Sequence, residues 1–145
     1  MHSYGSPQDG TGLIGHSGFV GGALLRQARF AACFNSATIA AIEGQSFGTL
    51  VCAAAPGSMF EANRAPTRDA AQIDALIARL SGVRAERFVL ISSIAVLADF
   101  AGGDDEATQA FQQTLAYGRH RRALEAFVER HFANSLIIRF SRQVS

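Results

Sequence analysis

The chain has 145 residues, which is long enough to bury a core but too short for two typical domains. Hydrophobic residues make up 48% of it and charged residues 17%, the composition of an ordinary globular protein. The net charge of +1 gives no general attraction to nucleic acid or to an anionic membrane, and no apolar run is long enough to cross a bilayer. We therefore expect one cytoplasmic domain over residues 1–145, without nucleic-acid or membrane partners. The sequence leaves open whether the protein forms a homo-oligomer.

The first ten residues are polar, so they are expected to be disordered and not a signal peptide. The two cysteines, Cys33 and Cys52, are too few for a disulfide framework, and their spacing matches no zinc motif. Both lie in apolar surroundings, so we expect small buried side chains and predict no metal site.

Apolar runs alternate with amphipathic stripes along the chain. Strands are predicted at Thr11–Ile14, Ala31–Asn35, Thr49–Ala54, Arg87–Ser92 and Ser135–Phe140. Helices are predicted at Phe19–Ala28, Pro66–Leu80 and Thr114–Phe132, with a short helical turn over 39–42 and a polar loop over 101–113. Unbroken apolar runs suit parallel strands that are covered on both faces. The expected fold class is therefore α/β, a Rossmann-like three-layer αβα sandwich with a mostly parallel sheet of about five strands.

A glycine-rich segment separates the first predicted strand from the first helix. A dinucleotide site needs a tight turn, bare backbone near the pyrophosphate and close helix packing, all of which glycine permits. We predict cofactor contacts from this turn, at Gly15, Ser17, Gly18, Phe19, Val20 and Gly21. His16 is expected to be a loop residue near the phosphates. The alternative is a plain turn, because 14 glycines in one chain produce chance spacings.

The adenosine ribose of such a cofactor is usually met about 20 positions after the first glycine. In this chain that position is Asn35, with Ser36 beside it. Neither a carboxylate, which favours NAD, nor an arginine, which favours NADP, stands there. The predicted cofactor is therefore NAD or NADP, with the choice open.

Three further segments accompany the glycine turn: Val51-Cys-Ala-Ala-Ala55, Val89-Leu-Ile-Ser-Ser93 and Tyr117-Gly-Arg-His-Arg121. With them the sequence resembles the extended or atypical short-chain dehydrogenases/reductases, the group called NAD-dependent epimerases/dehydratases, from about Thr11 to Phe140. The resemblance implies that Ala53, Ala54 and Ala55 pass beneath the adenine and ribose. It also implies a catalytic set of Tyr117, Ser93 and Arg121.

The chemistry of that set follows from its residue types. A phenol has a reference pKa of about 10, so it works as a base at neutral pH only beside a fixed cation. Arg121 lies on the same helix face as Tyr117, because the two are four positions apart. Ser93, at the end of a strand, would hydrogen-bond the substrate oxygen while Tyr117 acts as general acid/base. The alternatives are a serine that only ends its strand and a tyrosine that only packs.

The sequence departs from the family at several points. Arg121 stands where the family has lysine, and Val96 is followed by Leu97 where the family has valine-tyrosine-glycine. One strand-helix unit between Asn35 and Thr49 is expected to be missing, as is the C-terminal region that forms most of the family's substrate pocket.

Three functional hypotheses remain. The leading one is an NAD(P)-dependent oxidoreductase or epimerase acting on a hydroxyl or carbonyl of a small molecule; the resemblance alone points to a nucleotide sugar. The alternatives are a non-catalytic cofactor-binding sensor or regulatory protein and a truncated family fragment. A basic run at residues 119–122 is interpreted as a solvated helix face near Glu125 and Glu129, and not as a nucleic-acid site.

Overall fold

The computed structural model of the chain describes residues 10–55, 58–98 and 110–140. The expectations for residues 1–9 and 101–109 lie outside these ranges. Five strands form one sheet in the order β2-β1-β3-β4-β5, and every pair of neighbours is parallel. Their bounds are β1 Thr11–Ile14, β2 Ala32–Phe34, β3 Ser46–Cys52, β4 Arg84–Ser93 and β5 Ser135–Phe140. The predicted parallel α/β sheet is confirmed.

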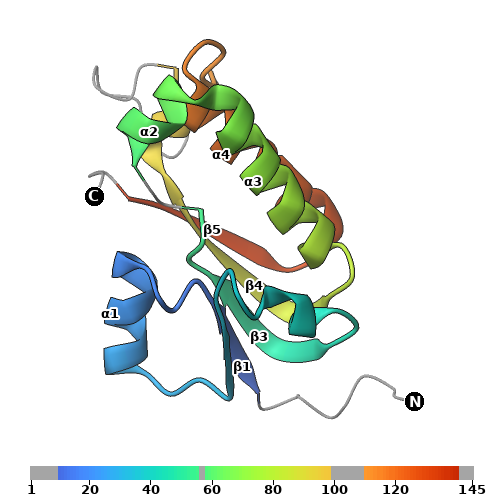
Figure 1. Ribbon diagram of the computed structural model, residues 1–145. Coiled ribbons are helices and arrows are strands. Elements are labelled where there is room, and N and C mark those ends of the chain that lie inside the picture. The colour runs from blue at the N-terminus through green and yellow to red at the C-terminus, as the bar shows by residue number, and fades with distance from the viewer. Residues whose placement is uncertain (1–9, 56–57, 99–109, 141–145) are drawn as a thin grey trace.

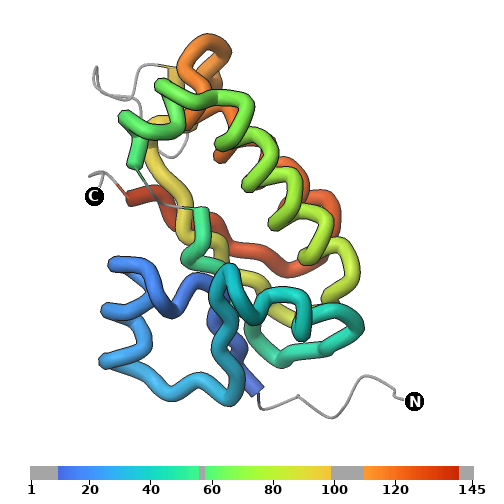
Figure 2. Tube along the Cα trace, in the orientation of Figure 1, coloured from blue at the N-terminus to red at the C-terminus, as the bar shows by residue number. Residues whose placement is uncertain are grey.

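Helices lie on both faces of this sheet. They are α1 Phe19–Gln27, α2 Met59–Arg64, α3 Pro66–Leu80 and α4 Ala116–His131, with short 3-10 helices η1 Ile39–Ile42 and η2 Ile94–Val96. Figure 1 shows α1 on one face and the pair α3 and α4 on the other. The trace in Figure 2 shows the same separation between the blue start of the chain and its green and orange helices. The three-layer arrangement is therefore confirmed.

The core is divided by the sheet because consecutive strand residues point to opposite faces. Beneath α3 and α4, a large cluster includes Ile14, Leu50, Phe88 and Leu124, all 2% exposed or less. On the α1 face a smaller cluster surrounds Leu13 and Val20. On the edge strand β5, alternate apolar residues stay exposed, namely Leu136, Ile138 and Phe140.

Several boundaries differ from the predictions. The third and fourth strands begin three residues earlier than expected, because polar Ser46 pairs with Arg84 in the sheet ladder before the apolar run starts. Helix α2 was not predicted, although Ser58 caps it by accepting a hydrogen bond from the Glu61 amide at 3.1 Å. Between β2 and β3 the structure places only η1, in agreement with the expected missing strand-helix unit.

The prediction of a solvated face around Glu125 was wrong. Glu125 is 0% exposed and accepts hydrogen bonds from Arg139 at 2.7 and 3.0 Å and from Arg122 at 3.0 Å. Both arginines also lie against the Phe111 ring. This network joins α4 to β5. The carboxylate can be buried because the two arginines compensate its charge.

Candidate functional site

The glycine turn lies at the carboxyl-terminal edge of the sheet, directly after β1. Gly15 has a φ of +90°, and a Cβ there would lie 2.8 Å from the carbonyl carbon of Ala53. A Cβ on Gly21 would overlap the carbonyl oxygen of Gly15. Gly18 differs, because the nearest atom to its Cβ position is 3.5 Å away. Gly15 and Gly21 therefore allow close packing, whereas a Cβ on Gly18 would fit at ordinary contact distance, with space left beside the first turn of α1.

That open space faces the positive end of a helix. Gly18 is the N-cap of α1, and the first turn contains no acidic residue. The unpaired amides of a first helical turn favour an anion. Phe19 is 70% exposed here, whereas the side chain of Val20 is buried against Leu13. Of these two predicted contacts, Phe19 has an exposed side chain and Val20 a buried one.

Asn35 connects the glycine turn to the end of β2. Its side-chain amide donates to the Ser17 hydroxyl at 3.1 Å, and its side-chain oxygen accepts from the amides of Ala37 and Thr38 at 3.0 and 3.1 Å. These hydrogen bonds connect the glycine turn to the segment that follows β2. Ser36, the next residue, is exposed beside them.

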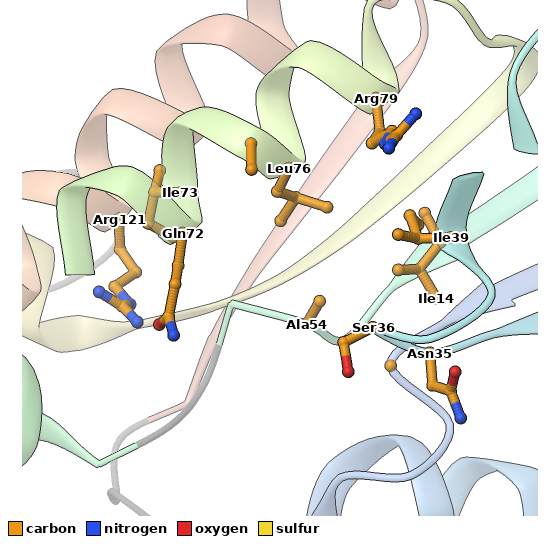
Figure 3. A pocket seen from close by; sticks show the side chains of 12 residues that line it. Ile14, Asn35, Ser36, Ile39, Ala54, Gln72, Ile73, Leu76, Arg79 and Arg121 are labelled. Carbon is orange, nitrogen blue, oxygen red and sulfur yellow. The ribbon is translucent and has the colours of Figure 1, made fainter. Parts of the chain in front are cut away.

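A cavity of about 540 Å³ opens next to these segments. Its lining comes from the ends of β1 and β3, the segment after β2, and one face of α3 (Figure 3). Five of the predicted site residues line it: Gly15, Asn35, Ser36, Ala54 and Arg121. Gln72, Leu76 and Arg79 of α3 lie across the cavity from Asn35 and Ser36, and Arg121 lies beside Gln72 (Figure 3). The described lining therefore contains two cations and no carboxylate.

Tyr117 belongs to a second part of the site, at the start of α4. It is 0% exposed and packs with Met59, Ala62 and Ala95. Its amide donates to the Asn63 side-chain oxygen at 2.8 Å. Its hydroxyl is buried and meets no hydrogen-bond partner within the described residues. A buried hydroxyl without a partner is costly, and most buried polar groups have one.

Gly118 explains how α4 approaches the end of β4. A Cβ at that position would overlap the carbonyl oxygen of Ala95 in η2. Ser93, which ends β4, accepts a hydrogen bond from the Ala95 amide at 3.1 Å and is 7% exposed. This bond occupies an acceptor site of Ser93 and leaves its proton free to be donated. The neighbouring Ser92 hydroxyl is buried and has no partner among the residues described.

Arg121 joins the two parts of the site. Its guanidinium carbon lies 4.1 Å from the centre of the Tyr117 ring, as the helical spacing predicts. Its Nε donates to the Ala55 carbonyl at 3.0 Å, and a terminal nitrogen donates to Asp69 at 2.5 Å. The cation therefore contacts the end of β3, the start of α3 and the tyrosine together.

Asp69 is buried, at 5% exposed, and His120 lies 2.6 Å from the same carboxylate oxygen that Arg121 contacts. Burial, the largest single influence, favours the neutral carboxyl. The hydrogen bonds and charges of Arg121 and His120 outweigh it and hold the pKa of Asp69 below its ordinary value. We infer an ionised Asp69 at neutral pH.

Asp69, Asn63 and Gly118 were missed by the sequence analysis. Asn63 lies in α2, which was not predicted, and Asp69 looks like an ordinary first-turn carboxylate of α3. Gly118 directly follows Tyr117, and its closeness to Ala95 depends on how α4 packs. Only the Ser58-x-x-Glu61 pattern, typical of a helix start, was visible in the sequence.

No family model and no curated protein matches this sequence. Solved structures do match its fold. The chain is similar to a UDP-glucose 4-epimerase from Thermotoga maritima, solved with UDP-glucose, at a TM-score of 0.63 and 16% identity over 90% of this chain and 54% of that one. It is also similar to a dTDP-4-dehydrorhamnose reductase from Yersinia enterocolitica. The TM-score is 0.65 and the sequence identity 17%, over 90% of this chain and 52% of that one.

A third match is an NAD-dependent NDP-hexosamine 5,6-dehydratase of tunicamycin biosynthesis, at a TM-score of 0.67 and 18% identity over 90% of this chain and 54% of that one. At these low identities, the TM-scores show a shared fold alone, the Rossmann-like α/β architecture. The chain spans about half the length of the structures it matches. Within the described residues, no helix is both long and apolar enough to cross a membrane.

Proposed function

We propose that this chain binds NAD or NADP at the carboxyl-terminal edge of its sheet and belongs among the oxidoreductases or epimerases that act on a hydroxyl or carbonyl group. The observation that carries the proposal is the glycine turn: two positions exclude any side chain, and the third opens toward a helix N-terminus. That combination suits a pyrophosphate, which needs backbone amides at close range. The resemblance to the extended short-chain dehydrogenases/reductases supports the same assignment.

The residues present fit a dinucleotide. The backbone from Gly15 to Gly21 would hold the pyrophosphate, Asn35 and Ser36 would meet the adenosine ribose, and Ala54 would border the adenine. The adjoining cavity of about 540 Å³ gives the adenosine half room. The described lining has no carboxylate to repel an added phosphate. This charge pattern admits NADP as well as NAD.

The proposed chemistry places proton transfer on Tyr117. A bound nicotinamide supplies the hydride acceptor or donor. Tyr117 would give a proton to a carbonyl oxygen, or take one from a hydroxyl, at its Oη atom. Ser93 would donate its free proton to the same substrate oxygen, and Arg121 would supply positive charge beside the phenol. The Tyr117 hydroxyl, for which the described part of the chain offers no partner, supports this role.

A nucleotide sugar is the proposed substrate class. Two of the similar structures are a UDP-glucose 4-epimerase and an NDP-hexosamine dehydratase, and both names specify a sugar nucleotide. Because the chain spans about half of each, this proposal depends on the shared half alone.

A second candidate function is non-catalytic cofactor binding, in a sensor or regulatory protein. The observation that favours it is the burial of Tyr117, which is 0% exposed, together with the pairing of Arg121 to Asp69. A catalytic phenol must reach its substrate, and an uncompensated cation would activate it more strongly.

Turnover separates the two candidates. Purified protein is incubated with NAD or NADP and a panel of UDP- and dTDP-sugars, and product is followed by cofactor absorbance and sugar chromatography. Enzymatic function predicts conversion that disappears in Tyr117→Phe. Cofactor binding without conversion of any sugar, in wild type and variant alike, would favour the sensor.

A further inference from the structure

Among the described residues, the Arg121 guanidinium contacts three groups, and one of them is charged. The Ala55 carbonyl accepts from Nε, the centre of the Tyr117 ring lies 4.1 Å from the guanidinium carbon, and Asp69 accepts from a terminal nitrogen. Arg121 is 6% exposed. A buried cation is stable only when an opposite charge compensates it, and a carbonyl dipole or an aromatic face alone does not do so.

Asp69 also has interactions other than its contact with Arg121. It lies in the first turn of α3, where the helix dipole favours a carboxylate, and its amide donates to the Ala65 carbonyl at 3.1 Å. His120 contacts the same carboxylate oxygen. The other charged groups nearby are Glu61, which pairs with Arg64, and Arg68. Glu61 and Arg68 line a cavity of about 400 Å³ together with Asp69 and Arg121.

We propose that Asp69 is a positioning residue for Tyr117, acting through Arg121. By compensating the guanidinium, Asp69 keeps it against the phenol ring and against the Ala55 carbonyl at the end of β3. Without that charge, a buried arginine would turn its head into the adjoining cavity toward water and leave the ring. This inference rests on the proposed function only in treating Tyr117 as the catalytic acid/base. The contact between Arg121 and the Tyr117 ring can be tested without cofactor.

The chain offers a direct spectroscopic probe. It has two tyrosines, Tyr4 and Tyr117, and no tryptophan, so Tyr4→Phe leaves Tyr117 as the sole tyrosine chromophore. In that background, the near-ultraviolet circular dichroism of Tyr117 is recorded at neutral pH in Asp69→Asn, in Arg121→Gln and in the double variant. The matched control is Glu129→Gln, which removes an exposed carboxylate that pairs with Arg122 on the same helix.

Loss of the cation from the ring is expected to change the near-ultraviolet spectrum in the same way in either single variant. The double variant should differ from the parent no more than Arg121→Gln does, because Asp69 acts through Arg121. The control should leave the spectrum unchanged. An Asp69→Asn spectrum that matches the parent would overturn the proposal, as would additive changes in the double variant.

An Asp69→Asn spectrum that matches Arg121→Gln supports the positioning role. The measurement uses no cofactor or substrate. A failure of NAD and NADP binding would therefore refute the proposed function while leaving this contact to be judged on its own result.

Discussion

Gly21 and Gly18 separate the packing of the glycine turn from its proposed binding role. A Cβ on Gly21 would overlap the Gly15 carbonyl oxygen and lie 2.6 Å from its carbon, both rigid backbone atoms. Such overpacking costs about 3 kcal/mol, and the better helix propensity of alanine returns about 1 kcal/mol. We therefore expect Gly21→Ala to lower the free energy of unfolding by about 2 kcal/mol.

Gly18→Ala is the matched comparison. Its backbone, at φ −81° and ψ 176°, suits any residue, and its Cβ would have ordinary contacts. We expect a stability change under about 1 kcal/mol, but NADPH affinity about tenfold weaker, because the methyl group occupies the open space at the helix start. Urea unfolding by circular dichroism and NADPH fluorescence give the two quantities. Wild-type stability in Gly21→Ala, or an equal loss in both variants, would refute the reasoning.

Three other outcomes follow from the burial of named groups. Tyr117→Phe should abolish turnover but keep cofactor affinity. Its free energy of unfolding should change by less than about 1 kcal/mol, because the hydroxyl that it removes has no described partner. A large destabilisation in urea would contradict this. Because the pKa of folded Asp69 is lowered, its ionised form stabilises the protein above the unfolded pKa of about 3.9, and this contribution disappears as the pH falls through the folded pKa. Asp69→Asn should therefore flatten the acid limb of the stability profile, and an unchanged limb would disprove the pairing. Burial raises the pKa of Cys52 to about 11, so a thiol reagent at neutral pH should modify half-buried Cys33 and reach Cys52 only after unfolding. Mass spectrometry of the native protein checks this, and a modified Cys52 would contradict it.

The sheet could be predicted from sequence because each strand carries its own signal. Runs such as Phe88–Ile91 are apolar throughout, as strands buried on both faces require, and Gly15 marks the turn after β1. Strand starts could not be predicted so well. Ser46 and Arg84 enter the ladder only because they face each other across neighbouring strands, which is a property of the pairing and not of either segment.

The candidate site could be predicted only where its contacts are local. The contact between Tyr117 and Arg121 follows from helical spacing and is present. The partner of Arg121 is Asp69, 52 residues earlier, and the two meet because α3 packs beside α4. No periodicity within either helix reveals that pair. The roles assigned to the individual site residues, and the single domain over residues 1–145, stay predictions.

Cofactor binding tests the central claim most directly. The purified chain is titrated against NADH and against NADPH, with cofactor fluorescence as the readout and Gly18→Val as the control. Valine would place two methyl groups in the open space beside the first turn of α1, and backbone at this φ and ψ tolerates it. We predict saturable binding of at least one cofactor by the wild type and none by Gly18→Val. Absence of binding in the wild type, or equal affinity in the two proteins, would contradict the account.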